Sequence, residues 1–252
     1  IGKITDIEMS AFYKDIRDLL ALQSIRYESE KYGPSNYAIY MNKDYGNVKG
    51  YTFSFTKRYD PVSKTSAFVD YTYQVTEGNS VNSGSFYYNA LSGEQEEKRI
   101  VPLAWDQRHI LNTNLSVGDP RNWNVGVISK LSSGWPYTPN VPDANYVPQP
   151  NSGRKPWQWR VDMRVHKNFK IGNFNYLFFM KVYNLLDRRN ERYVFNDTGR
   201  AGYTYVYQST QETQGFKNHY GEVGVHEWSE YQVRPQYYTS PRSINIGFSV
   251  DF

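Results

Sequence analysis

Apolar and polar residues alternate with a period of two along much of the chain. In the segment 242–252, every second residue is apolar, and the residues between them are polar or small. The segment 157–171 is nearly as regular, with Lys167 as the polar exception on its apolar side. In an extended chain, this period places alternate side chains on opposite faces of a β-strand. The pattern therefore predicts strands with one apolar and one polar face.

Weaker versions of the same alternation recur elsewhere in the chain. They lie at 7–14, 51–56, 69–75, 111–117, 125–137 and 174–187. The segment 174–187 is the most ambiguous, because Leu177 and Phe179 make both of its faces apolar. Together with the two clearest segments, these stretches predict an all-β chain of about eight antiparallel strands.

The predicted connections between strands alternate in length. Short turns containing Pro, Gly, Asp, Asn or Ser fall at 60–65, 119–122 and 172–173, and long connections fall at 22–46, 77–105, 139–156 and 188–241. Compact soluble domains rarely contain so many long loops. Outer-membrane barrels have short turns at the periplasmic rim and long loops outside. The rhythm predicts a transmembrane β-barrel segment whose first strand runs outward and whose last strand runs inward.

Large aromatic residues stand at the ends of the predicted strands, on the apolar side. Those next to long loops are Trp135, Tyr137, Trp157 and Trp159, and those next to short turns are Trp123 and Tyr59. Two aromatic levels match the two interfacial girdles of a membrane barrel, because these rings favour the headgroup region. The alternative interpretation is a soluble β-sandwich that buries the same rings in its core.

Composition narrows the class of protein. Aromatic residues make up 17% of the chain, yet mean hydropathy is -0.73, which excludes a helical membrane protein and fits strands with one lipid face. There is no Cys, hence no disulfide framework or thiolate metal site. The small net charge of +4 is dispersed and indicates no nucleic-acid partner. No signal peptide precedes the first strand, so we expect a processed chain or a piece of a longer one.

Several strings of residues occur in a characteristic order. They read YKDIRDL at 13–19, DYGNVKG at 44–50, WDQRH at 105–109, SGWPYTP at 133–139 and VYNLLDRRN at 182–190, and the chain stops at Phe252. Together they resemble the C-terminal barrel of TonB-dependent outer-membrane receptors. The resemblance covers the whole chain. It implies that residues 1–252 are the C-terminal portion of a 22-stranded plugged barrel, without its plug domain and N-terminal strands.

The same resemblance implies a function and partners. Such receptors are not enzymes: they lie in the bacterial outer membrane and import scarce metal chelates, vitamins, glycans or peptides with energy from the TonB complex. The expected partners are outer-membrane lipid, the remaining barrel and plug, and TonB through the absent N-terminal part. The barrel-assembly machinery would read Phe248 and Phe252 in the last strand. A closed eight-stranded barrel with a structural or adhesive role and a soluble glycan-binding β module are the alternatives.

Candidate site residues follow from these faces and loops. Polar-face residues expected to line the lumen and contact the plug are Arg108, Lys130, Arg160, Asp162, Arg164 and His166. Aromatic residues of the last long loop that could capture ligand are Tyr193, Phe195, Tyr203, Tyr205, Tyr207, Trp228 and Tyr231. No nucleophile motif, phosphate-binding loop or standard metal-ligand spacing occurs. We therefore expect no catalytic residues, no cofactor and no metal.

Overall fold

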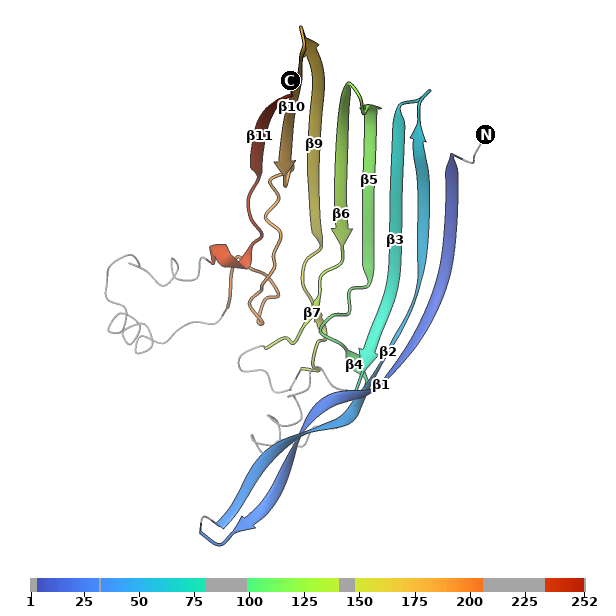
Figure 1. Ribbon diagram of the computed structural model, residues 1–252. Coiled ribbons are helices and arrows are strands. Elements are labelled where there is room, and N and C mark those ends of the chain that lie inside the picture. The colour runs from blue at the N-terminus through green and yellow to red at the C-terminus, as the bar shows by residue number, and fades with distance from the viewer. Residues whose placement is uncertain (1–3, 32, 80–98, 141–147, 206–233, 252) are drawn as a thin grey trace, which may run out of the picture.

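One antiparallel sheet dominates the computed structural model, which describes residues 4–31, 33–79, 99–140, 148–205 and 234–251 (Figure 1). Its long strands are β1 (Thr5–Ser29), β2 (Gly33–Asp60), β3 (Thr65–Gly78), β5 (His109–Asp119), β6 (Trp123–Ser132), β9 (Gln158–Ile171), β10 (Phe174–Tyr183) and β11 (Ser243–Asp251). The short β4 (Val101–Pro102) pairs with β3. A separate small sheet joins β7 (Pro136–Tyr137) to β8 (Gly153–Arg154), and η1 (Pro235–Tyr237) is a 3-10 turn.

The long strands follow one another across the sheet in chain order, β1-β2-β3-β5-β6-β9-β10-β11. Every pair is antiparallel, so the prediction of an all-β antiparallel meander of about eight strands is confirmed. The alternative of a closed eight-stranded barrel requires β1 to pair with β11. Within the described residues, these two strands instead form the opposite edges of the sheet.

The apolar sides of neighbouring strands coincide in register. Leu115 in β5 lies opposite Ala67 and Val127, and Val127 lies opposite Met163 in β9. This face is uncovered: Leu115 is 48% and Ile246 67% exposed. No second sheet of the described residues packs on it, as a β-sandwich would require. The prediction of one apolar and one polar face thus holds, and the soluble sandwich finds no support.

Short turns and long connections lie at opposite ends of the sheet. The turns after β2, β5 and β9 all lie at the end where both chain termini are found, whereas the longer connections lie at the other end (Figure 1). We call these the short-turn end and the loop end. Among the described residues, no helix is both long and apolar enough to cross a membrane.

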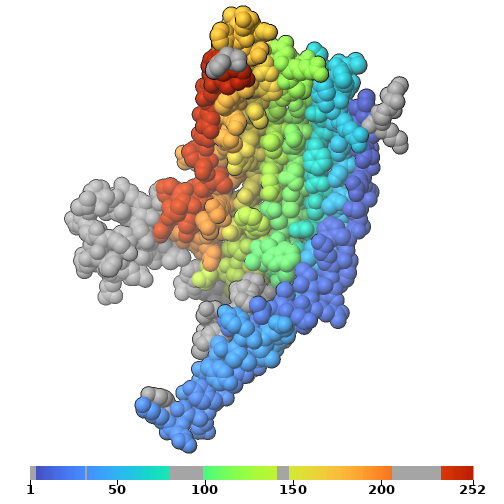
Figure 2. All heavy atoms as spheres, viewed as in Figure 1, coloured from blue at the N-terminus to red at the C-terminus, as the bar shows by residue number. Residues whose placement is uncertain are grey.

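The predicted long loop at 22–46 is wrong. β1 and β2 stay paired as far as Ser29 opposite Gly33, and they form a two-stranded ribbon that projects beyond the other strands (Figures 1 and 2). We call residues 19–44 the arm. The sequence concealed it because both of its faces lie away from the sheet, so pairing there imposes no alternation of apolar and polar residues.

Two other predicted boundaries also shift. The strand predicted at 125–137 ends at Ser132, and Pro136 and Tyr137 belong to the small β7–β8 sheet. The chain turns away at Gly134, where any Cβ would collide with the backbone of Lys155. The strand predicted at 174–187 ends at Tyr183, because Asn184 adopts a left-handed conformation with φ of 53°.

Candidate functional site: the polar face and the loop end

The predicted lumen residues share one face of the sheet. Lys130 lies opposite Arg160, and Arg164 lies opposite Gly126 and Lys181. Strand alternation places Asp162 and His166 on the same side of β9. The register therefore brings Lys130, Arg160, Asp162, Arg164 and His166 onto the polar face, whereas Arg108 lies just before β5, with its Nε 3.4 Å from the Asp106 carboxylate. That this face lines a lumen stays a prediction.

A shallow hollow follows the polar face. Its volume is about 560 Å³, and its lining includes Asn114, Ser116, Asp162, Arg164 and Lys181. These residues come from β5, β9 and β10, so several strands of the sheet supply the polar groups jointly. Both charge signs and several neutral hydrogen-bonding groups are present. The hollow can therefore accept a polar surface, whether from another protein segment or from a hydrated solute.

Asp162 links β9 to the end of β10. Its Oδ1 accepts hydrogen bonds from Arg160 Nε at 2.9 Å and from the backbone N–H of Asn184, also at 2.9 Å. The Arg160 side chain is 56% exposed, so its ion pair contributes little to stability. The bond to Asn184 fixes the point where the chain leaves the sheet. Asp162 thus has a structural role in addition to its predicted place in the lumen.

A buried carboxylate organises the base of the outer loops. The side chain of Asp106 is fully buried, accepts the backbone N–H of Thr76 at 2.8 Å and forms an ion pair with Arg154. Arg108 Nε lies 3.4 Å from the same carboxylate. One side chain therefore joins the end of β3, the loop before β5 and the small β7–β8 sheet. Sequence reasoning missed Asp106, because an isolated loop aspartate has no periodicity to distinguish it.

Two asparagines of the VYNLLDRRN string replace missing strand bonds. Asn190 accepts the backbone N–H of Trp159 at 2.9 Å through Oδ1 and donates Nδ2 to its carbonyl at 3.0 Å. Asn184 donates Nδ2 to the carbonyls of Arg188 and Ser240, at 3.2 and 3.1 Å. Both asparagines are 5% exposed. They hold the ends of β9 and β10 and the approach to β11 together.

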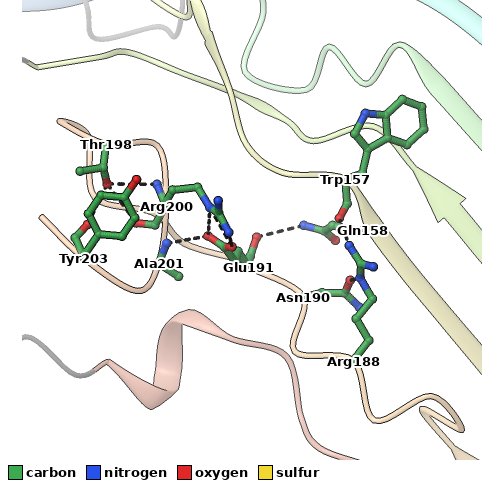
Figure 3. A network of polar contacts seen from close by, with 9 residues as sticks. All are labelled: Trp157, Gln158, Arg188, Asn190, Glu191, Thr198, Arg200, Ala201 and Tyr203. Atoms are coloured by element: carbon green, nitrogen blue, oxygen red, sulfur yellow. Dashed lines mark hydrogen bonds and ion pairs between the residues drawn. The ribbon is translucent and has the colours of Figure 1, made fainter.

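The chain after Asn190 folds around the carboxylate of Glu191. Arg200 approaches it through Nη2 at 2.7 Å and Nε at 3.0 Å, and the backbone N–H of Ala201 donates to it at 2.6 Å (Figure 3). The hydrogen bond from Arg200 to Glu191 raises the pKa of that guanidinium. Gln158 Nε2 lies 3.4 Å from the carbonyl of Glu191. This loop is therefore held in a defined shape against the start of β9.

The predicted ligand-capturing aromatics fall into two described groups. The rings of Tyr193 and Phe195 pack on Tyr237, with centroids at 5.9 and 5.2 Å, and Tyr203 meets Tyr205 edge-on at 5.6 Å. Tyr193 is 49% and Tyr205 67% exposed, so each group offers ring surface outward. Tyr207, Trp228 and Tyr231 lie outside the described residues. Ligand capture by any of these residues stays a prediction.

Lys155 also belongs to this surface, although sequence reasoning did not select it. Its Nζ donates to the carbonyl of Arg192 at 3.2 Å and lies 5.8 Å from the centre of the Tyr193 ring. Burial lowers the pKa of its ammonium group. Lys155 therefore joins the β7–β8 region to the last long loop through one carbonyl and one aromatic ring.

The predicted girdle residues take different positions. Trp123 and Trp159 belong to β6 and β9 on the apolar face, and Trp159 Nε1 donates to Ser129 Oγ at 2.9 Å. Trp157 stacks on His109 with centroids 5.5 Å apart. Trp135 lies just beyond β6 and is 38% exposed. Membrane contact by these four stays a prediction.

Tyr137 differs from that prediction. It lies outside the main sheet, and its ring packs on Gly153 and Gly199 within the loop region. Burial, followed by the nearby Asp197 carboxylate, raises the pKa of its hydroxyl. The physical reason is the break at Gly134, which takes the following residues off the strand. Tyr137 therefore packs among the loops and lies off the main sheet, and membrane contact by this residue stays a prediction.

An additional aromatic cluster strengthens the loop end of the apolar face. Tyr51 and Tyr73 stack at 5.3 Å, Tyr73 meets His109 at 5.1 Å, and Tyr71 Oη lies 2.9 Å from His109 Nδ1. With Trp157 on the other side of His109, the rings bridge β2, β3, β5 and the start of β9. The alternation in the sequence already predicted that the tyrosines lie on this face. It could not predict that they meet at one histidine, because that depends on the register between the strands.

The remaining expectations concern metals and the last strand. No group of His, Asp and Glu in the described residues has the arrangement to hold a metal ion. Phe248 lies on the apolar face, 58% exposed and 5.6 Å from Tyr176 between ring centres. Phe252 lies outside the described residues. Their predicted role as an assembly signal stays a prediction.

Comparison with known proteins now bears on the fold. The chain is similar to the solved structure of the outer membrane transporter YddB from Escherichia coli, with a TM-score of 0.56 and 13% sequence identity. The match covers 78% of this chain and 28% of the transporter, so the chain spans little more than a quarter of its length. No protein-family model and no curated protein matches the sequence. At this identity, the likeness shows the fold: the meander matches part of an outer membrane transporter.

Proposed function

We propose that this chain is part of an outer-membrane transporter that imports a scarce ligand with energy delivered through TonB. One observation carries the proposal: a single meander has an uncovered apolar face, a charged opposite face, and all its long connections at one end. That combination suits a wall between lipid and a water-filled interior. The fold likeness to part of an outer membrane transporter supports the same class of protein.

TonB dependence is the finer part of the proposal. It rests on the ordered strings that resemble TonB-dependent receptors, of which VYNLLDRRN and WDQRH have clear structural roles in this chain. The asparagines of the first string close the ends of three strands, and Asp106 of the second fixes the loop base. These roles suit a barrel whose outer loops must be held rigidly above the strands. The plug and the TonB-contacting segment would come from outside these residues.

The proposed division of labour follows the geometry. The polar face, with Lys130, Arg160 and Arg164, would contact the plug and the passing ligand. The exposed rings around Tyr193 and Tyr205 would bind a metal chelate, a vitamin, a glycan or a peptide, because aromatic loop residues provide large and fairly rigid contact area. The uncovered apolar face would contact outer-membrane lipid. Phe248 would take part in recognition by the assembly machinery.

The first test is location. The full-length protein should band with outer membranes in a sucrose gradient and should show heat-modifiable mobility, as closed membrane barrels do. Recovery in the soluble fraction would overturn the membrane assignment. This measurement requires no knowledge of the ligand.

The second test is energised import. Cells with and without the gene would be offered three probes: a ferric chelate labelled with radioactive iron, cyanocobalamin and a fluorescent oligosaccharide. We expect the cells to accumulate one of the probes. This accumulation should require the gene and should stop when a proton uncoupler is added. If cells with the gene bind the probe but accumulate equal amounts of it with and without the uncoupler, energised import is contradicted.

A further inference from the structure

Two cross-strand pairs of like charge lie on the polar face of the sheet. Lys130 in β6 is directly opposite Arg160 in β9. Further along β9, Arg164 is directly opposite Lys181 in β10. The Cβ atoms of residues in such positions are about 5 Å apart, and like charges there are destabilising. We call the two pairs the first and second levels of a cationic track.

All four cations share one face. Arg160 and Arg164 are separated by an even number of residues in β9, so strand alternation directs both side chains to the same side. Residues directly opposite each other in neighbouring strands also share a face, which places Lys130 and Lys181 on that side too. The apolar residues of the same stretch, such as Met163, alternate with them and lie on the other face.

One carboxylate accompanies the cationic track. Asp162 lies between the two levels, and its Oδ1 is 2.9 Å from Arg160 Nε. Within the ranges that the structure describes, Lys130, Arg164 and Lys181 form no ion pair. The described residues therefore neutralise only part of the positive charge of the track.

Two hollows of the polar face adjoin the cationic track. Arg164 and Lys181 line the hollow of about 560 Å³ described above. Arg160 and Arg192 line a second hollow of about 370 Å³ nearer the loop end, and no Asp or Glu of the described chain is in its lining. Tyr183 lines both hollows, so they adjoin each other. Open space thus follows the cations from the loop end into the sheet.

We propose that the cationic track binds an elongated polyanionic solute, such as an acidic oligosaccharide, with one anionic group at each level. The levels are about 13 Å apart, because four residues of β9 separate Arg160 from Arg164. Guanidinium and ammonium groups donate charge-assisted hydrogen bonds to carboxylates and phosphates. The proposal rests on the transport function proposed above and names the class of solute. Arg192 would meet this solute first, at the loop end.

The experiment measures binding to the full-length protein in a mild non-ionic detergent by isothermal titration calorimetry. The probes are trigalacturonate as an elongated polyanion, ferric citrate as a compact one, and neutral maltotriose. The track variant, Lys130→Gln with Arg164→Gln, removes one cation from each level. Its matched control, Lys14→Gln with Lys170→Gln, removes the same charge from the polar face outside the track. Lys130→Arg with Arg164→Lys keeps the charge of the track.

Wild type, the control and the charge-keeping variant should bind trigalacturonate, and the track variant should bind it at least about ten-fold more weakly. Maltotriose should not distinguish the track variant from wild type. Equal affinity of the track variant and the control for trigalacturonate would overturn the proposal. Binding of ferric citrate but not of trigalacturonate to wild type would overturn the elongated solute.

A second variant leaves all the cations in place. Gly126 lies opposite Arg164, and a Cβ there would meet no atom nearer than 3.9 Å, so a small side chain fits. Gly126→Asp places a carboxylate beside Arg164 and should weaken the binding of trigalacturonate. Gly126→Asn adds a side chain of similar size without the charge and should bind as wild type does. Equal weakening in both variants would contradict an electrostatic role for the second level.

Stability distinguishes a solute from an acidic segment of the plug. Without solute, the track variant should be at least as stable as wild type in thermal unfolding, because each level loses one of two like charges. If plug carboxylates neutralised the track instead, the same variant would lose ion pairs and unfold at a lower temperature. A less stable track variant with unchanged affinity for trigalacturonate would overturn the proposal in favour of the plug.

The proposed transport function and the cationic track can fail separately. A protein that binds trigalacturonate but shows no energised uptake of it refutes only the transport proposal. A protein that imports a neutral probe and does not bind trigalacturonate refutes only the cationic track.

Discussion

Strands β1 and β2 are paired with each other both in the main sheet (residues 5–16 and 46–57, here called the inner half) and in the arm, but only the inner half alternates apolar and polar residues. In the inner half, Ile7 and Met9 lie opposite Phe55 and Phe53 on one uninterrupted apolar face. In the arm, the register continues through pairs such as Gln23 with Ile39, without a consistent apolar side. The change comes at an irregularity between Ile16 and Leu19, where Asp18 has a φ of 60°.

This difference separates two causes of structure. Backbone pairing operates in both halves, whereas strict alternation appears only in the inner half, where the sheet has one apolar and one polar face. The loop end obtains its order in another way, from buried side chains such as Asp106 and Asn190 that bond to backbone groups. The main sheet and the loop end should therefore be destabilised by different substitutions.

A charge on the apolar face should have the largest effect. Phe55→Arg places a cation at the middle of the inner half of β2 and should destabilise the full-length protein by about 2–4 kcal/mol if that face contacts lipid. Tyr40→Arg in the arm of the same strand should change stability by no more than about 0.5 kcal/mol. Reversible unfolding in urea, followed by tryptophan fluorescence in lipid vesicles, measures both.

The neighbouring position supplies the control for that substitution. Thr56 lies on the polar face and lines its hollow, so Thr56→Arg has room and water for its charge. A loss of stability equal to that of Phe55→Arg would show that the faces do not differ in their surroundings. The comparison between inner half and arm would then have to be abandoned.

Removal of the Asp106 carboxylate should have the next largest effect, confined to the loop end. Asp106→Ala leaves the buried N–H of Thr76 without an acceptor and should cost about 1–3 kcal/mol. Hydrogen exchange at the Thr76 amide and limited proteolysis of the outer loops would report the loss. Asp106→Asn, which keeps an acceptor, should lose less. Unchanged exchange at Thr76 in the alanine variant would refute the role given to this side chain.

A smaller effect is expected inside the arm. Tyr27 and Tyr37 meet edge-on at 5.6 Å between ring centres, an arrangement worth about 0.5–1.5 kcal/mol. Tyr27→Ala should speed hydrogen exchange of amides in the arm and leave the inner half unchanged. The matched control is Tyr40→Ala, since the Tyr40 ring has no aromatic contact within the described part of the chain and is 69% exposed. Identical exchange in the two variants would contradict a role for the ring pair.

The smallest effect concerns pH. Burial lowers the pKa of Lys155, so between that lowered value and its ordinary value the unfolded loop binds more protons than the folded one. The loop should therefore become more stable as pH rises through this window and less stable as pH falls through it. Proteolysis of the loop across a series of pH values below the ordinary lysine pKa of about 10.4 would show the trend. The trend should disappear in Lys155→Met, and its persistence there would assign it to another group.

The main sheet could be predicted from the sequence because alternating apolar and polar residues repeat in most of its strands. Leu115 and Asn114 are neighbours that lie on opposite faces, and many such pairs indicate where a strand runs and which of its faces is apolar. The polar-face positions of Lys130 and Arg160 follow from the same rule. That Lys130 and Arg160 lie directly opposite each other in β6 and β9 could not be predicted, because it depends on the register of the two strands, which the turns determine.

The parts that could not be predicted have no period. The arm has two comparable faces, so its pairing leaves no pattern in the sequence. Asp106 acts through a single buried contact set, and Gly134 acts by lacking a side chain where the Lys155 backbone approaches. Tyr137 was placed wrongly for that reason: one glycine moved it from the sheet into the loops. Such features depend on contacts between distant segments, which alternation does not encode.

The sequential order of the strands has a consequence for how the sheet is formed. Each long strand pairs with the strands that precede and follow it in that order, so a finished hairpin exposes one edge on which the next can grow. Sheet growth of this kind requires only comparatively local loop closures, which carry a smaller entropic barrier than distant pairings. The tight turns after β2, β5 and β9 would each begin a hairpin. Assembly could then advance through the sheet in steps, each stabilised before the following segment arrives.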